Sequence, residues 1–249
     1  MISKEVSDCR SCGVKFGHSL VHQAPRFGLG PSRGLEGLSC HKDSELFVIG
    51  PNPPEVNPYH GAWRVKYKGK RTDEEECVRD MIAALGYKEK QVYITCAVKC
   101  PTHFDKPPCR QLTWECSNKF LKRELEGQRP RFILCLGSVA DDALGSIQKL
   151  PRVFEKGYKV IHEPGIGDAK GATVKVFNNV VIAPHPNRVN RDPDGDQPWE
   201  MRSGHSYPPG ISERMKRAGP VHPFPVSGIA LQSWISAIKA AIEHIKESE

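Results

Sequence analysis

The sequence predicts an α/β fold with three layers, α/β/α, around a central, mainly parallel sheet of four strands. Short apolar runs at 45–49, 92–98, 132–136 and 180–183 are typical of strands that are buried on both faces. Amphipathic stretches lie between them, and strands that alternate with helices form parallel sheets covered on both sides. Two of the runs end in proline-rich polar turns. Because ligands of such folds bind outside the carboxyl ends of the strands, both turns are candidates for a functional site.

The first two strands are each followed by a helical pattern. After the strand at 45–49, apolar residues recur at helical spacing over 73–85. After the strand at 92–98, a second helix is expected over 113–125. The expected inward residues of the two helices are Val78, Met81, Ile82, Leu85, Trp114, Phe120, Leu121 and Leu125.

The last two strands have clear ends. The strand at 132–136 stops at Gly137, and Ser138 can cap a helix over 139–144. The strand at 180–183 leads directly into a polar turn. A packing helix over 229–245 is expected to close the chain.

Length and composition indicate one domain over residues 1–249, since 38% hydrophobic content can bury a substantial core and no internal repeat is present. No apolar run of about 18 residues exists, and the N-terminus lacks a basic region followed by an apolar one. We therefore expect a soluble, cytoplasmic monomer without a membrane partner. The net charge of +7 favours a polyanionic partner. A long irregular basic insertion is expected over 188–228, and loops of that length in compact domains are usually functional or disordered.

The cysteines suggest a metal centre rather than disulfides. Nine cysteines without a secretion signal argue against a disulfide framework. Cys9 and Cys12 form a CxxC pair in a loop, which brings two thiolates to one metal. Cys100 and Cys116 are the expected second pair, with Cys109 as the rival fourth ligand. Spacing leaves tetrahedral zinc and an iron–sulfur cluster open, and ligand chemistry alone favours zinc.

Four motifs in this order resemble those of the uracil-DNA glycosylase superfamily, and most of all its branch with an iron–sulfur cluster. They are Gly-Pro-Asn-Pro-Pro at 50–54, Tyr-Ile-Thr-Cys-Ala-Val-Lys-Cys-Pro at 93–101, Arg-Pro-Arg-Phe-Ile-Leu-Cys-Leu-Gly at 129–137, and His-Pro-Asn at 185–187. The resemblance covers most of residues 9–190. It implies that Cys9, Cys12, Cys100 and Cys116 bind a structural [4Fe-4S] cluster, which replaces the preference for zinc.

The resemblance also implies a catalytic pair. Cleavage of an N-glycosidic bond leaves an oxocarbenium-like sugar and an anionic base. His185 can donate a hydrogen bond to a pyrimidine carbonyl oxygen as charge develops there, and Asn52 can orient the attacking water. No lysine stands at either of these two positions to form a Schiff base. The expected reaction is therefore monofunctional hydrolysis that leaves an abasic site in DNA, after the target nucleotide has flipped out of the duplex.

Further residues follow from the same resemblance. Around the catalytic pair, the expected substrate-binding residues are Gly50, Pro51, Tyr59, Trp63, Cys96 and Asn187. Tyr59 and Trp63 lie where the family places an aromatic side chain that stacks on the flipped base. The residues expected to fill the gap in the duplex and hold phosphates are Arg188, Asn190 and Arg191.

Four positions depart from the pattern of the branch. Pro51 and Asn52 stand where an acidic residue and a small one are usual, and Gly-x-Asn-Pro looks like the mismatch-specific and single-strand-selective branches. Cys96 stands where the family has an asparagine that contacts the uracil edge, and a thiol cannot replace an amide that both donates and accepts. Asn187 stands in place of serine.

These departures predict a DNA glycosylase whose target is a pyrimidine with a 5-substituent, including the hypermodified cytosines of phage genomes, in antiviral defence. One alternative is excision of uracil in DNA repair. An alternative of another class is a non-catalytic, metal-stapled protein that binds nucleic acid.

Overall fold

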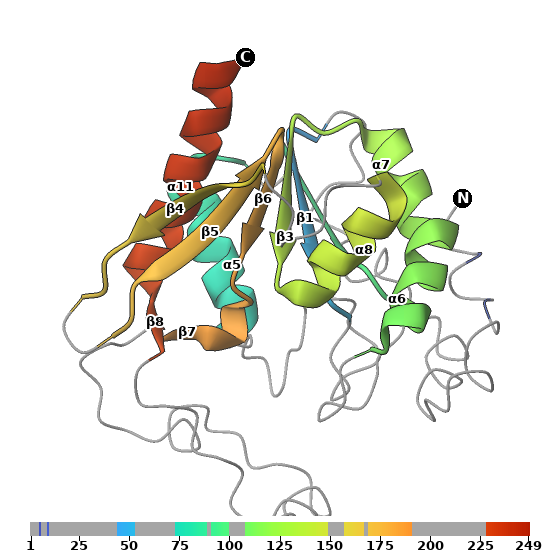
Figure 1. Cartoon of the computed structure of the whole chain (residues 1–249), viewed down its shortest axis with the longest axis horizontal. Helices are drawn as coiled ribbons and strands as arrows, with labels where there is room; N and C mark the ends of the chain where they lie inside the picture. Colours follow the sequence, from blue (N-terminus) through green and yellow to red (C-terminus); the bar gives the residue numbers. More distant parts are fainter. Residues whose placement is uncertain are drawn as a thin grey trace, which may run out of the picture.

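A six-stranded mixed sheet forms the centre of the structure, a computed structural model (Figure 1). The structure describes Glu5, Cys9 and residues 44–52, 73–88, 91–99, 108–148, 157–166, 169–190 and 228–249. The strand order is β2-β1-β3-β6-β5-β4. Its strands are β1 (Leu46–Gly50), β2 (Val92–Cys96), β3 (Phe132–Leu136), β4 (Lys159–Glu163), β5 (Ala172–Phe177) and β6 (Val180–Ala183).

The prediction of a mainly parallel sheet is confirmed, but the expected number of four strands is wrong. β2, β1, β3 and β6 are parallel, and β5 and β4 add an antiparallel pair at the β6 side. The missed strands lack a continuous apolar run. In β5, buried Ala172, Val174 and Val176 alternate with more exposed residues, and the edge strand β4 is largely exposed. This alternation is typical of antiparallel strands with one face on the core.

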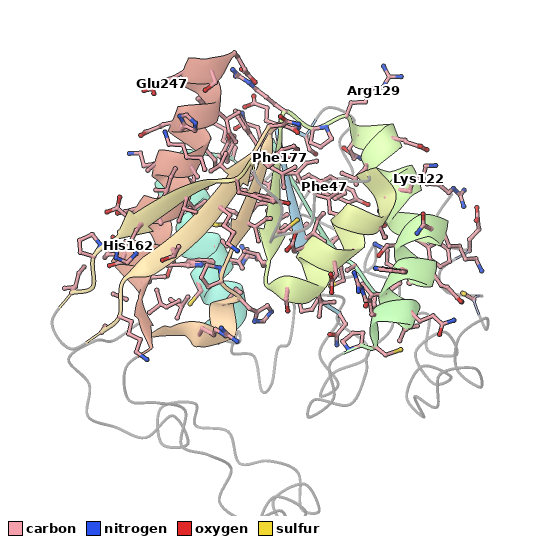
Figure 2. The ribbon with its side chains drawn as sticks, in the orientation of Figure 1. Phe47, Lys122, Arg129, His162, Phe177 and Glu247 are labelled. Atoms are coloured by element: carbon pink, nitrogen blue, oxygen red, sulfur yellow. The ribbon has the colours of Figure 1, made fainter. Side chains whose placement is uncertain are left out.

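Helices cover both faces of the sheet, which confirms the three layers (Figure 1). One face packs against α5 (Asp73–Ala84) and α11 (Leu231–Ser248), and the core there includes Val48, Met81 and Trp234. The other face packs against a helical layer with its own core, which includes Phe47 (Figure 2). This layer consists of α6 (Arg110–Cys116), the π-helical η2 (Ser117–Leu121), α7 (Lys122–Gln128) and α8 (Ser138–Gln148).

Some local expectations need correction. Trp114 is 37% exposed rather than inward, and the Arg110 guanidinium lies over its ring, 4.4 Å from the centroid. Ile229 belongs to a short strand, β8 (Ile229–Ala230), and not to the closing helix. Ser138 is the first residue of α8 rather than a cap before it. In each case, neighbouring elements decide the outcome of a local pattern that is itself compatible with more than one structure.

The carboxyl ends of the four parallel strands meet at one edge of the sheet. Gly50 at the end of β1 is in register with Cys96, and Leu136 at the end of β3 is in register with Ala183. β8 pairs with β7 (Val189–Asn190), and Ile229 of β8 also bridges to Lys170. This edge therefore carries both polar turns predicted from the sequence. Among the described helices, none is sufficiently long and apolar to traverse a lipid bilayer.

Candidate active site

The turn that carries Asn52 is anchored to the neighbouring strand by its backbone. The Ala97 N–H donates to the Gly50 carbonyl at 2.8 Å, and the Val98 N–H donates to the Pro51 carbonyl at 2.9 Å. These bonds continue the pairing of β1 with β2 beyond the last paired residues. Asn52 is half-buried and directly follows this anchored segment. Its backbone position at the edge of the sheet is therefore set by two strands.

The turn that carries His185 is held from three sides. The carbonyl of Pro184, the residue before His185, accepts a hydrogen bond from Trp234 Nε1 at 3.0 Å. The His185 carbonyl accepts from the Arg188 N–H at 3.0 Å, which closes the 3-10 helix η3 (Pro186–Arg188). The Gly137 N–H donates to the Ala183 carbonyl at 2.9 Å. The half-buried imidazole is thus carried by a backbone fixed to α11 and β3.

Gly137, which the sequence pattern predicted only as a strand end, lies directly against His185. Its φ is +86°, a conformation that side chains rarely adopt. A Cβ at this position would lie 3.2 Å from the Cβ of His185, so the histidine packs directly on the glycine backbone. The signal in the sequence was the glycine at the strand end, but its contact lies 48 residues further along the chain.

Asn52 and His185 therefore follow two parallel strands, β1 and β6, with β3 and Gly137 between them. Since neighbouring strands are about 4.8 Å apart, these two strands are separated by about 10 Å. Gly137 contributes no side chain at this point. An amide and an imidazole therefore follow strands on either side of β3 at the same edge of the sheet.

Asp141 lies one turn into α8, behind this edge. Its N–H donates to the Gly137 carbonyl at 3.2 Å. The pKa of the Asp141 carboxyl is raised to about 6, mainly by burial and also by the nearby Asp142, while Lys175 partly offsets the increase. Close to neutral pH, this carboxyl carries a charge that its surroundings disfavour.

Two of the four predicted cysteine ligands are in the described part of the chain: Cys116, which ends α6, and Cys9, which contacts the helical turn that follows it. Cys116 is buried, and its Sγ accepts the Lys99 N–H at 3.3 Å. Lys119 Nζ lies 3.4 Å from Cys9 Sγ. Cys100 directly follows Lys99 in the sequence. Cys9 therefore contacts a residue three positions after Cys116, and Cys116 contacts the residue before Cys100 in the sequence.

The surroundings of these sulfurs fit thiolate ligands. A backbone N–H and an ammonium group stabilise negative charge on sulfur, and such hydrogen bonds are common around iron–sulfur clusters. The contrast with Cys135 is clear, because burial raises the pKa of that thiol well above its usual range. Cys109, the rival ligand, is exposed just before α6. No group of three metal-binding side chains is assembled within the described residues, which do not include Cys12 and Cys100.

The remaining predicted residues are distributed as follows. Cys96 ends β2 and its side chain is fully buried in the core on the α5 side of the sheet. Asn187 and the exposed Arg188 are in η3, and Asn190 is in β7, so all three follow His185 at the carboxyl edge. Three predicted residues lie outside the described part of the chain: Tyr59, Trp63 and Arg191.

Comparison with known proteins agrees with the motifs. Residues 37–204 match the uracil DNA glycosylase superfamily. Over 139 residues, the chain is 27% identical to the type-4 uracil-DNA glycosylase of Archaeoglobus fulgidus. The alignment covers 56% of this chain and 59% of that relative, so the chain spans less than two-thirds of the relative's length. The superfamily match includes both turns of the candidate site.

Proposed function

We propose, because this chain belongs to the uracil-DNA glycosylase superfamily, that it is a monofunctional DNA N-glycosylase. It would flip a pyrimidine nucleotide out of DNA, hydrolyse the N-glycosidic bond and leave an abasic site. The observation that carries this proposal is the placement of Asn52 and His185 at the carboxyl ends of β1 and β6, on either side of Gly137.

His185 has the chemistry to stabilise the leaving base. When the bond breaks, negative charge grows on a carbonyl oxygen of the pyrimidine, and an N–H donor aimed at that oxygen lowers the barrier. A donor of this kind must be fixed before the reaction. The contacts of its turn with Trp234 and Gly137 supply that rigidity.

Asn52 is proposed to orient the water that attacks the sugar carbon. An amide both donates and accepts hydrogen bonds but is not a strong base. The oxocarbenium-like sugar needs a positioned nucleophile more than a strongly activated one. Lys99, the lysine nearest in sequence to the β2 end, is engaged in an ion pair with Glu124, which is consistent with hydrolysis without a Schiff base.

The proposed target is a pyrimidine with a 5-substituent, with hypermodified phage cytosines as the leading case and antiviral defence as the role. Support comes from Cys96, whose buried thiol stands where the family has an asparagine that contacts uracil. A site without that amide loses the groups that reject a wrong base edge. Uracil excision in DNA repair is the alternative.

The segment after His185 is proposed to contact the DNA backbone. Arg188 is exposed, and Asn190 follows it in β7 at the same edge. Cationic and polar side chains at this position can hold phosphates and fill the gap that the flipped nucleotide leaves. Arg191 is included in this proposal from its place in the sequence.

Cys9, Cys12, Cys100 and Cys116 are proposed to hold a [4Fe-4S] cluster. When bound, the cluster would serve as a structural brace between the N-terminus and the helical layer. The residues that support it are Lys99 and Lys119, which contact two of the four sulfurs. Zinc bound by the same four cysteines is the alternative, and metal analysis of the purified protein distinguishes it from the cluster.

A substrate panel tests the proposed function. The protein is incubated with matched single- and double-stranded oligonucleotides that contain cytosine, uracil or 5-hydroxymethylated and glucosylated cytosine, and alkali then cuts any abasic site. Cleavage of a modified cytosine above uracil supports the proposed target, and cleavage of uracil alone establishes the repair alternative. Binding without cleavage of any substrate would contradict a glycosylase and leave the non-catalytic reading. An Asn52→Ala/His185→Ala double variant controls for contaminating activity.

A further inference from the structure

A buried ion pair lies directly behind the turn that follows β2. Lys99 Nζ is 2.6 Å from Glu124 Oε2, and the two side chains are 1% and 4% exposed. Lys99 Nζ also donates to Thr95 Oγ1 and to the Cys96 carbonyl, both at 2.7 Å. Thr95 Oγ1 in turn donates to Glu124 Oε2 at 2.9 Å. The ammonium group therefore has three acceptors for its three hydrogens.

A buried pair of this kind is weak evidence for added stability. The desolvation of two charges offsets much of their attraction, and apolar replacements of both partners are often neutral. Such pairs are retained in some proteins because they specify one conformation. The position of Lys99 indicates which conformation this pair specifies.

The residues from Cys96 to Lys99 connect the candidate active site to the cysteine site. Ala97 and Val98 donate their N–H groups to the turn of Asn52, at the Gly50 and Pro51 carbonyls. The next N–H, that of Lys99, donates to Cys116 Sγ. The Lys99 side chain then returns to the Cys96 carbonyl. One short segment thus supports the catalytic turn on one side and a predicted ligand on the other.

The π-helical turn brings the partner residues to this segment. Glu124 is eight residues beyond Cys116, and in a regular α-helix at about 100° per residue the two would point about 80° apart. The wider turn of η2, Ser117–Leu121, advances by less per residue and so reduces that angle. Ser117 Oγ also donates to the Ala97 carbonyl at 3.3 Å. The same helical segment therefore presents Cys116, Ser117 and Glu124 to residues 96–99.

We propose that Lys99 and Glu124 are a positioning pair that holds segment 96–99 in place, and that this segment couples the geometry of the Asn52 turn to that of the Cys116 sulfur. The effect on catalysis rests on the proposed function above. The coupling between the Asn52 turn and the Cys116 sulfur does not depend on it. Lys99 acts through backbone groups and not on the substrate.

The test uses the full-length protein with its metal and a double variant, Lys99→Met/Glu124→Leu, which removes both charges together. This choice avoids an unpaired buried charge, which by itself can prevent folding. The matched control is Lys122→Met/Glu126→Leu. That control removes an exposed ion pair from the same helical segment. Lys122 Nζ lies 4.0 Å from Glu126 Oε1, and the two side chains are 51% and 63% exposed. Figure 2 labels Lys122.

Three readouts are compared between the variants. Hydrogen exchange at the Ala97 and Val98 amides should become at least about tenfold faster in the Lys99/Glu124 variant, while the β3 amides stay protected. Loss of bound metal to a chelator should also become several-fold faster. On the preferred substrate of the panel, kcat should fall about tenfold or more with a smaller change in KM, since a mispositioned Asn52 affects the reaction more than binding. The control should match the wild type in all three.

Unchanged exchange at Ala97 and Val98 in a folded Lys99/Glu124 variant would overturn the proposal, whatever the activity. If that variant does not fold, a Lys99→Gln/Glu124→Gln variant, which also removes both charges but keeps a hydrogen-bonding group at each position, is measured in the same way, with the same expected direction. If the protein cleaves no substrate, the proposed function fails. Hydrogen exchange and metal loss still decide whether the Lys99–Glu124 pair couples the Asn52 turn to the Cys116 sulfur.

Discussion

At the scale of single residues, backbone contacts fix the positions of the two candidate catalytic residues. His185 lies against Gly137, and its preceding carbonyl is bound by Trp234. Asn52 follows two residues whose carbonyls are bound by β2 and its turn. These backbone contacts place an imidazole and an amide at one edge of the sheet.

Replacing either polar group should remove activity and leave the fold intact. We expect Asn52→Ala and His185→Ala each to lower product formation by about 10²-fold or more, the usual cost of a positioned polar group. Single-turnover assays measure this, with DNA affinity and the melting temperature as controls. Near-wild-type turnover in one variant would exclude that residue from the mechanism.

Gly137→Ala should damage both stability and activity. The positive φ and the 3.2 Å approach to His185 predict a loss of about 1–3 kcal/mol in the free energy of unfolding. Gly145→Ala is the matched control in α8, where an added Cβ meets nothing within 4 Å and should stabilise the helix by about 0.5–1 kcal/mol. Chemical denaturation of both variants provides the comparison. Equal stabilities would show that the backbone at Gly137 is not constrained.

At the scale of elements, the site depends on how strands and helices meet at the carboxyl edge. β1, β3 and β6 bring three turns together, and α8 begins directly after the middle one. On the other side of β1, the helical segment α6–η2–α7 supports β2 and its turn through Ser117 and Glu124. The start of α8 and the π-helical η2 therefore support the site structurally.

Asp141 at the start of α8 should make stability depend on pH. Because its pKa is about 6 in the folded protein and 3.8 as the reference value, the folded state binds the proton more tightly than the unfolded state. Its contribution to the free energy of unfolding is therefore present at low pH and is lost as pH rises between about 4 and 6.

We accordingly expect Asp141→Asn to raise the melting temperature above about pH 6 and to have little effect near pH 4. Thermal unfolding across that range measures the difference. Glu126→Gln, an exposed change on α7, is the control and should show no such trend. A difference that is constant with pH would contradict the assignment to Asp141.

At the scale of the whole molecule, contacts distant in sequence attach the described N-terminal residues to the helical layer. Arg123 donates hydrogen bonds from Nη1 and Nη2 to the two carboxylate oxygens of Glu5, and Lys119 contacts Cys9. A cysteine-bound metal at this point would join segments that are about 100 residues apart. The loop that such a link closes is long, so its loss should have a large effect on the unfolded chain.

Metal removal should therefore destabilise the protein as a whole. We expect purified protein to be brown, with about four iron atoms and four acid-labile sulfides per chain. Cys9→Ala and Cys116→Ala should both be colourless and poorly soluble, whereas Cys109→Ala should keep its iron. Visible absorption and metal analysis check this. A colourless wild type with one zinc per chain would establish the zinc alternative.

The sequence by itself determined the local features of this protein. Apolar runs specified the four parallel strands, and helical periodicity specified the helices, because both depend on side-chain periods within a few residues. The turns with Asn52 and His185 were identified from proline and glycine at the strand ends. The resemblance to family motifs then predicted a catalytic role for those turns.

Only the tertiary structure decided the contacts between distant segments. The two antiparallel strands, the approach of Gly137 to His185 and the bond from Trp234 to Pro184 all join elements whose own patterns do not name a partner. The burial of Lys99 was likewise not predictable from the local sequence, because a single lysine after a strand is usually exposed. Its burial becomes favourable only when the π-turn brings Glu124 to the same place, since a charge leaves water only where another charge and fixed hydrogen bonds replace its hydration.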